Sequence, residues 1–219
     1  MRIAEKLTIR QWKELDKILN NKENVCWEYA FRFFEERIET RYLKPIEAIL
    51  NMGDNKGEGF AVVNLQCSLI ETIESFIQGC YSEFNKKKRF TEWKKRNGDI
   101  IFTSNKKIFH SFFSKRSEFV KYKISGKEFY KDVRCGLLHE TQTKKGWLIL
   151  TDTEKSNYSY QEKNNFKIIY REIFQLELRN LIERYGKAII EGKDFDEISN
   201  KEDLRQNFRD KFNHICKQS

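Results

Sequence analysis

Two side chains near the middle of the 219-residue chain could act together on a ribose phosphate. Arg134 and His139 stand five positions apart in the polar segment 129–147. A histidine titrates near neutral pH, so it can take the proton of a ribose 2′-hydroxyl, which then attacks the adjacent phosphate. An arginine stays charged and donates in a planar fork, so it can hold the phosphate oxygens as charge develops on them. The residue types therefore fit cleavage of RNA without a metal.

The same two side chains also have structural roles open to them. Arg134 could form an ion pair with Asp132 or Glu140. His139 could instead stabilise a helix C-terminus through the helix dipole. His139 and Glu140 begin the H-E-x-x-H pattern of zinc proteases, but Thr143 stands where that pattern needs its second histidine. No metal and no cofactor is therefore expected.

The pair lies on an expected helix over residues 128–139. At about 100° per residue, Arg134 and His139 project roughly 140° apart, so one straight helix cannot bring them together. Cys135 and Leu138 form an apolar strip between them. We expect either that the glycine at position 136 loosens the last turn or that a second copy of the chain docks on this strip. The second arrangement predicts a homodimer in which two Arg–His pairs line one cleft.

Positive charge is concentrated in one stretch of the chain. The net charge is +9, and residues 86–127 hold 14 Lys and Arg against three acids. Such clustering attracts polyanions, whereas a dispersed excess mainly aids solubility. Cations that alternate with aromatic rings can contact the phosphates of RNA and stack on its bases. The alternative is that this segment is an ordinary solvated surface. A membrane partner is not expected, because no apolar helix face accompanies the charge. The candidate RNA contacts are Lys86, Lys87, Lys88, Arg89, Trp93, Lys94, Lys95 and Arg96.

The hydrophobic pattern predicts a mainly α protein with a single domain over residues 1–219. Pro45 is the only proline, so long helices are left unbroken, with a bend expected near it. The three-to-four spacing of apolar residues predicts helices over 7–19, 24–50, 60–81, 108–119, 128–139, 171–191 and 203–216. Two short runs rich in β-favouring residues, 147–151 and 167–170, predict a small β-hairpin insertion at 147–170.

The cysteines and the most apolar segment indicate in which cellular compartment the protein is expected. Five scattered cysteines without a C-x-x-C pair disfavour a disulfide framework and a zinc site, and fit reduced thiols in a cytoplasm. The segment Phe60–Ile77 is interrupted by Asn64, Gln66, Glu71 and Glu74, so we expect a buried helix and not a membrane span. A cytoplasmic protein is the expectation.

Four segments in order resemble one bacterial subfamily of the HEPN proteins. Arg134 and His139 match the R-x4-H motif of HEPN domains, and the resemblance covers residues 33–46, 57–60, 67–71 and 134–147. It implies a HEPN-like helical bundle, a homodimer and metal-independent RNA cleavage by Arg134 and His139, in defence or stress. Glu71, Glu140 and Lys144 are candidate supporting residues. Cys135 departs from the pattern, since many HEPN ribonucleases have Asn, Asp or His after the arginine.

Three functional hypotheses follow. The first is a metal-independent endoribonuclease, carried by Arg134, His139 and the basic stretch. The second is a non-catalytic RNA- or nucleotide-binding HEPN module, which Cys135 favours. The third is an interaction protein that uses the apolar strip at Leu138 and has no affinity for RNA.

Overall fold

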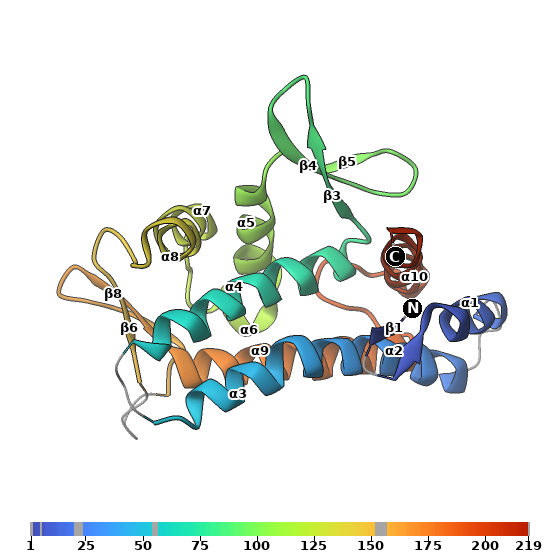
Figure 1. Cartoon of the computed structure of the whole chain (residues 1–219), viewed down its shortest axis with the longest axis horizontal. Helices are drawn as coiled ribbons and strands as arrows, with labels where there is room; N and C mark the ends of the chain where they lie inside the picture. The colour runs from blue at the N-terminus through green and yellow to red at the C-terminus, as the bar shows by residue number, and fades with distance from the viewer. Residues whose placement is uncertain (1, 5, 20–23, 54–56, 152–156, 219) are drawn as a thin grey trace. The chain divides into compact units, whose positions relative to one another are not determined.

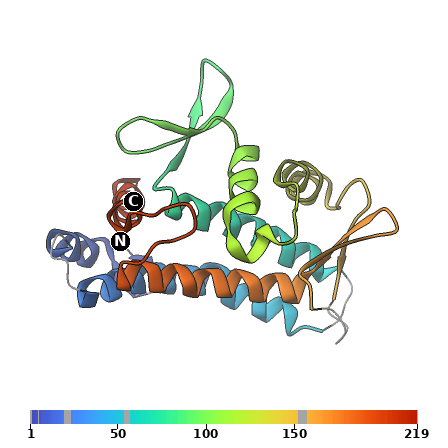
Figure 2. The ribbon, with the colours of Figure 1, turned by 180° about the vertical axis from the view of Figure 1, so that it is seen from behind.

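The computed structural model describes residues 2–4, 6–19, 24–53, 57–151 and 157–218, and divides the chain into two compact units. The first unit comprises Met1–Lys44, Ser75–Thr103 and Glu183–Ser219; the second comprises Pro45–Glu74 and Ser104–Ile182. Figure 1 labels the elements, and Figure 2 shows the same ribbon from behind. Each unit is built from segments far apart in the sequence, so its core depends on long-range contacts.

Aromatic side chains from the helices form the core of the first unit. Its elements are β1 (Arg2–Ala4), β2 (Leu7–Thr8), α1 (Ile9–Ile18), α2 (Asn24–Ile38), η1 (Glu39–Leu43), β3 (Tyr81–Asn85), β4 (Phe90–Lys94), β5 (Ile100–Phe102) and α10 (Lys201–Gln218). Thr8 and Gln11 form a capping box that fixes the start of α1. Trp12 of α1 stacks on Phe212 of α10 at 4.4 Å between ring centroids, and its Nε1 donates to Asn213 at 2.8 Å. The buried indole thus gains both area and a polar partner.

The second unit has its own aromatic core. Its elements are α3 (Lys44–Leu50), α4 (Glu58–Ile77), α5 (Asn105–Lys115), α6 (Ser117–Val120), α7 (Gly126–Glu128), η2 (Phe129–Arg134), α8 (Cys135–Glu140), β6 (Trp147–Leu150), β7 (Tyr160–Lys163), β8 (Phe166–Tyr170) and α9 (Arg171–Glu191), with the last residues of α4 and α9 assigned to the first unit. Within it, Gln66 of α4 donates to the backbone oxygen of Arg171 in α9 at 2.9 Å, so the two long helices lie side by side (Figure 1). Phe129 stacks nearly parallel on Phe174 of α9, and this contact ties η2 to the core.

The expected mainly α bundle with one β-hairpin is wrong. Alongside the helices the described chain holds three small sheets, with strand orders β1-β2, β3-β4-β5 and β6-β8-β7. The runs predicted to form a hairpin, 147–151 and 167–170, do pair, but β6 and β8 run parallel. The true hairpin is β7–β8, whose turn residues Asn164 and Asn165 both have positive φ, as a tight two-residue hairpin turn requires. Residues 152–156 of the predicted insertion lie outside the described residues.

The predicted helices are otherwise found, with shifts at their ends. The expected helix over 24–50 occurs as α2, η1 and α3 in succession. Its π-helical turn, η1, ends one residue before Lys44, which precedes Pro45. A proline cannot donate to the carbonyl four residues back, so the wider π turn falls where the ordinary ladder would be broken. The bend expected near Pro45 stays a prediction, because the structure shows a change of winding there.

α4 is long and apolar enough by composition to cross a membrane, but most of it is buried in the protein. Its Glu74 is fully buried and forms an ion pair with Arg116, Oε2 to Nε at 3.0 Å. The apolar composition of α4 is therefore that of a core helix whose buried charge is paired inside the protein.

A shielded lysine makes the stability of the first unit depend on pH. Lys211 donates to the backbone oxygen of Cys80 at 2.9 Å, and burial lowers its pKa from 10.5 to about 8. Between these values the unfolded chain binds more protons than the folded one, so the free energy of unfolding is expected to rise with pH from about 8 to about 10.5, by about 3 kcal/mol. Lys211→Met should flatten this rise in urea unfolding, whereas the exposed Lys13→Met should not. An unchanged slope in Lys211→Met would contradict the assignment.

Candidate active site

The helical segment that carries Arg134 and His139 changes its winding between them. Ser125 caps the start of α7 by accepting from the backbone N–H of Glu128, and η2 then continues as a π-helix that ends at Arg134. His139 follows in α8, which is α-helical. Short π segments inside helices are frequent at functional sites, because the extra residue re-aims the side chains beside it. Arg134 is the residue at this junction.

An acid from another helix orients Arg134. Its Nε donates to Oε1 of Glu71 in α4 at 3.0 Å, and the two side chains are 22% and 19% exposed. The guanidinium carbon also lies 5.8 Å from the ring centroid of Tyr130. Within the part of the chain that the structure describes, the terminal nitrogens of Arg134 form no ion pair. The side chain is thus fixed at Nε and keeps its outer edge for a ligand.

Burial and charge act in opposite directions on this pair. Burial lowers the pKa of Arg134, but the charge of Glu71 and its hydrogen bond outweigh that and leave the pKa above its ordinary value. Burial raises the pKa of Glu71, which Arg134 only partly offsets. The guanidinium therefore stays charged whatever the protonation of Glu71, because the ordinary pKa of an arginine already lies far above neutral pH.

His139 is exposed in the last turn of α8. The helix ends at Thr141, whose φ of 56° is left-handed and whose N–H donates to the oxygen of Gly136. No hydrogen bond joins the imidazole of His139 to Arg134 or to any other described residue. The ring is therefore open to a ligand.

The loop after α8 packs back on the helix at Gly136. A Cβ on Gly136 would lie 2.4 Å from the backbone oxygen of Gln142, so only glycine fits without a shift. The N–H of Lys144 donates to the backbone oxygen of Asp132 at 2.8 Å, and the Lys144 side chain forms an ion pair with Glu140. Of the candidate supporting residues, Glu71 contacts Arg134, while Glu140 and Lys144 contact each other. Gly136 permits a close approach of the loop.

The apolar strip beside the pair is partly open. Leu138 is 50% exposed, whereas Cys135 is half-buried. Burial raises the pKa of Tyr130, and Cys135, the residue that departs from the HEPN pattern, raises it further. The homodimer stays a prediction, and Leu138 is the residue a second copy would cover.

The first part of the basic stretch, residues 86–102, belongs to a three-stranded sheet, whereas α5, α6 and the start of α7 make up most of the rest. β3, β4 and β5 pair antiparallel. Buried Glu92 forms ion pairs with Lys88 at 3.0 Å and Lys94 at 3.6 Å. Lys95 donates to Asn207 at 3.0 Å, and Arg96 lies 3.5 Å from Asp210. Four of the predicted RNA-contacting cations are thus already partnered inside the first unit.

The remaining cations lie at the β3–β4 turn. Lys86, Lys87 and Arg89 are exposed, and among the described residues their side chains form no ion pair. They are the members of the predicted set that are free for phosphates. The sheet belongs to the first unit and the Arg134–His139 segment to the second, so each is assessed as a separate surface.

Trp93 was predicted to contact RNA, but the structure buries its side chain. Its side chain is 6% exposed, because it lies opposite Phe102 in the β4–β5 register and beneath the ammonium of Lys211, 5.8 Å from the ring centroid. A base cannot stack on a ring whose faces are covered. The exposed aromatic side chains of this sheet are Phe84 and Phe90.

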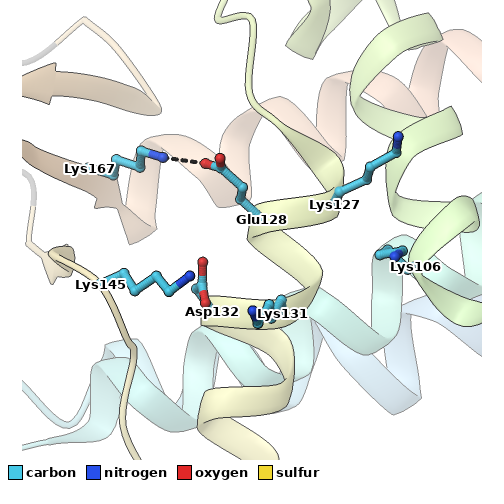
Figure 3. Close-up of a pocket in the computed structure, with 7 residues that line it drawn as sticks. All are labelled: Lys106, Lys127, Glu128, Lys131, Asp132, Lys145 and Lys167. Carbon is cyan, nitrogen blue, oxygen red and sulfur yellow. Dashed lines mark hydrogen bonds and ion pairs between the residues drawn. The ribbon is translucent and has the colours of Figure 1, made fainter.

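A lysine-lined cavity in the second unit was not predicted. It gathers five lysines from separate elements, of which only Lys106 and Lys127 fall in the basic stretch 86–127 (Figure 3). Each looks like an ordinary surface lysine in the sequence, so no local signal marks the group. Among the described residues, no cluster of three or more His, Cys, Asp or Glu could hold a metal ion.

Comparison of the chain with protein-family models, with curated proteins and with solved structures gives no match. The HEPN resemblance is therefore carried by the residues of this chain alone.

Proposed function

We propose that this protein is a metal-independent endoribonuclease whose catalytic residues are Arg134 and His139. One observation carries the proposal: Glu71 holds the guanidinium of Arg134 at Nε, and an exposed imidazole, His139, follows five positions later on the same helical segment. The resemblance of Arg134 and His139 to the R-x4-H motif of HEPN ribonucleases adds to it.

The two side chains divide the work of a transesterification. The imidazole of His139 takes the proton of the 2′-hydroxyl, whose oxygen forms a bond to the adjacent phosphorus. The bond from phosphorus to the 5′-oxygen breaks, and that oxygen takes a proton as it leaves. The products are a 2′,3′-cyclic phosphate and a 5′-hydroxyl. Arg134 donates to the non-bridging oxygens, where negative charge grows in the transition state.

The proton for the leaving oxygen comes, in this proposal, from the His139 of a second copy of the chain. The exposed Leu138, one position before His139, gives that copy an apolar surface to cover. Two copies docked there would bring two imidazoles to one cleft, so that one acts as base and the other as acid.

Incubation of RNA and of its all-deoxy analogue in EDTA tests this mechanism. We expect the RNA to be cut into fragments with cyclic phosphate ends and the deoxy strand to stay intact, because only the RNA carries the attacking hydroxyl. EDTA should not slow the reaction. Intact RNA at high concentration of folded dimer, or cleavage of the deoxy strand, would rule out the mechanism.

A second candidate is a non-catalytic RNA- or nucleotide-binding protein. The unpaired cations Lys86, Lys87 and Arg89 favour it, since they suit phosphates without any chemistry. It predicts binding of RNA that weakens as salt rises, survives His139→Ala and yields no products.

A further inference from the structure

Five lysines surround a cavity of about 270 Å³ in the second unit. They come from α5, α7, η2, the loop before β6 and β8, and the cavity lining consists of Lys106, Lys127, Glu128, Lys131, Asp132, Lys145 and Lys167 (Figure 3). Side chains from five places in the sequence thus converge on one hollow.

The lining carries more positive charge than its acids can neutralise. Lys167 forms an ion pair with Glu128. The other four lysines have no ion-pair partner among the residues that the structure describes. Four ammonium groups thus share the hollow with a single further acid, Asp132, so an anion bound among them would be stabilised by several contacts at once.

Asp132 adds a buried carboxylate that needs a hydrogen-bond donor. Its residue is only 3% exposed, and its Oδ1 has no hydrogen-bond partner within the described chain. In Figure 3 the carboxylate lies in the cavity lining, with Lys145 reaching towards it. A buried carboxylate oxygen without a donor is costly, so a ligand hydroxyl placed there would gain a strong hydrogen bond.

We propose that this cavity binds a nucleotide, with its phosphates among the lysines and a ribose hydroxyl on Oδ1 of Asp132. The lysines alone would suit any phosphate, but Asp132 would repel an anion and needs a donor, which the sugar supplies. The volume is near the lower end of ligand pockets, about 300–1,000 Å³. It therefore suits the phosphates and sugar, with the base outside. The inference does not depend on RNA cleavage.

Calorimetric titration with ADP at physiological ionic strength tests the site. We expect ADP to bind, and 2′,3′-dideoxy-ADP and pyrophosphate to bind at least about tenfold more weakly. In Asp132→Ala the difference between ADP and the dideoxy analogue should vanish. Because the comparison of the two ligands on the unaltered protein needs no substitution, it remains decisive if Asp132→Ala fails to fold.

Lysine variants supply the matched control. The double variant Lys131→Gln/Lys145→Gln should weaken ADP binding at least about tenfold. Lys163→Gln, at an exposed position of β7 outside the cavity, should leave ADP binding unchanged. Equal losses in both, or equal affinity for ADP and its dideoxy analogue, would overturn the proposal.

The source of the nucleotide is settled by competition. If an RNA oligonucleotide displaces ADP from the His139→Ala protein, the natural ligand is a nucleotide within an RNA strand. If it does not, the natural ligand is a free nucleotide. In both cases the cavity binds phosphates and a ribose hydroxyl. Absence of binding by both overturns the proposal. Because the cavity residues and His139 are separate, loss of RNA cleavage with ADP binding retained refutes only the proposed function.

Discussion

His139→Ala is expected to lower the rate of RNA cleavage by about 10²–10⁴-fold or more, because it removes the general base. The side chain is exposed and bonds no described residue, so the melting temperature should hardly change. Initial rates on a labelled oligonucleotide under saturating substrate measure the loss, and thermal unfolding of the same preparation confirms the fold.

A matched histidine makes this result specific. His110 is exposed on α5 in the same unit, so His110→Ala changes the same side chain away from the proposed site. It should cleave RNA at the original rate. Equal activity of all three proteins would remove His139 from the mechanism, and equal losses in both variants would show a general effect of surface charge.

Glu71→Gln separates positioning from chemistry at the same site. Glu71 holds Nε of Arg134 but is not expected to touch RNA. The amide keeps an acceptor and removes the charge, so the guanidinium should be less well oriented, and we expect kcat to fall by about tenfold with KM little changed. Glu71→Ala should cost more than Glu71→Gln. A change confined to KM would instead assign Glu71 to substrate binding.

The helices were predictable because their signal is local. In α4 the buried residues Cys67, Ile70, Ile73 and Ile77 repeat every three to four positions, and this spacing is visible in the sequence. The sheets lack such a signal. β3 alternates poorly, with Phe84 exposed, and the charge of the β3–β4 turn dominates its appearance. β8 pairs with β6 on one side and with β7 on the other, and the sequence of β7, Tyr-Gln-Glu-Lys, is too polar to predict a strand.

Only part of the candidate site could be predicted from the sequence. Arg134 and His139 stand out by type and spacing, but the partner that orients Arg134 is 63 positions away in another helix. The π-helical winding of η2 leaves no mark in residue types. Asp132, one of the two acids that could have paired with Arg134, instead lines the lysine-lined cavity. These features of the site depend on contacts between elements that are far apart in the sequence. The spacing of hydrophobic residues, which predicts individual helices, carries no information about such contacts.

Arg116→Met is expected to destabilise the protein by about 3–5 kcal/mol, because it leaves the Glu74 carboxylate buried without its countercharge. Both side chains are fully buried; the Nε of Arg116 lies 3.0 Å from Oε2 of Glu74, and Ser111 donates to Oε1 at 2.7 Å. Urea unfolding followed by circular dichroism measures the loss.

The double variant Arg116→Met/Glu74→Leu tests the reason for that loss. Removal of both charges leaves no stranded carboxylate, so stability should recover most of the way. Arg179→Met breaks the exposed pair with Glu47, 3.7 Å apart, and should cost no more than about 1 kcal/mol. If the double variant were as unstable as Arg116→Met, lost packing of the long arginine side chain, and not the isolated charge, would be the cause.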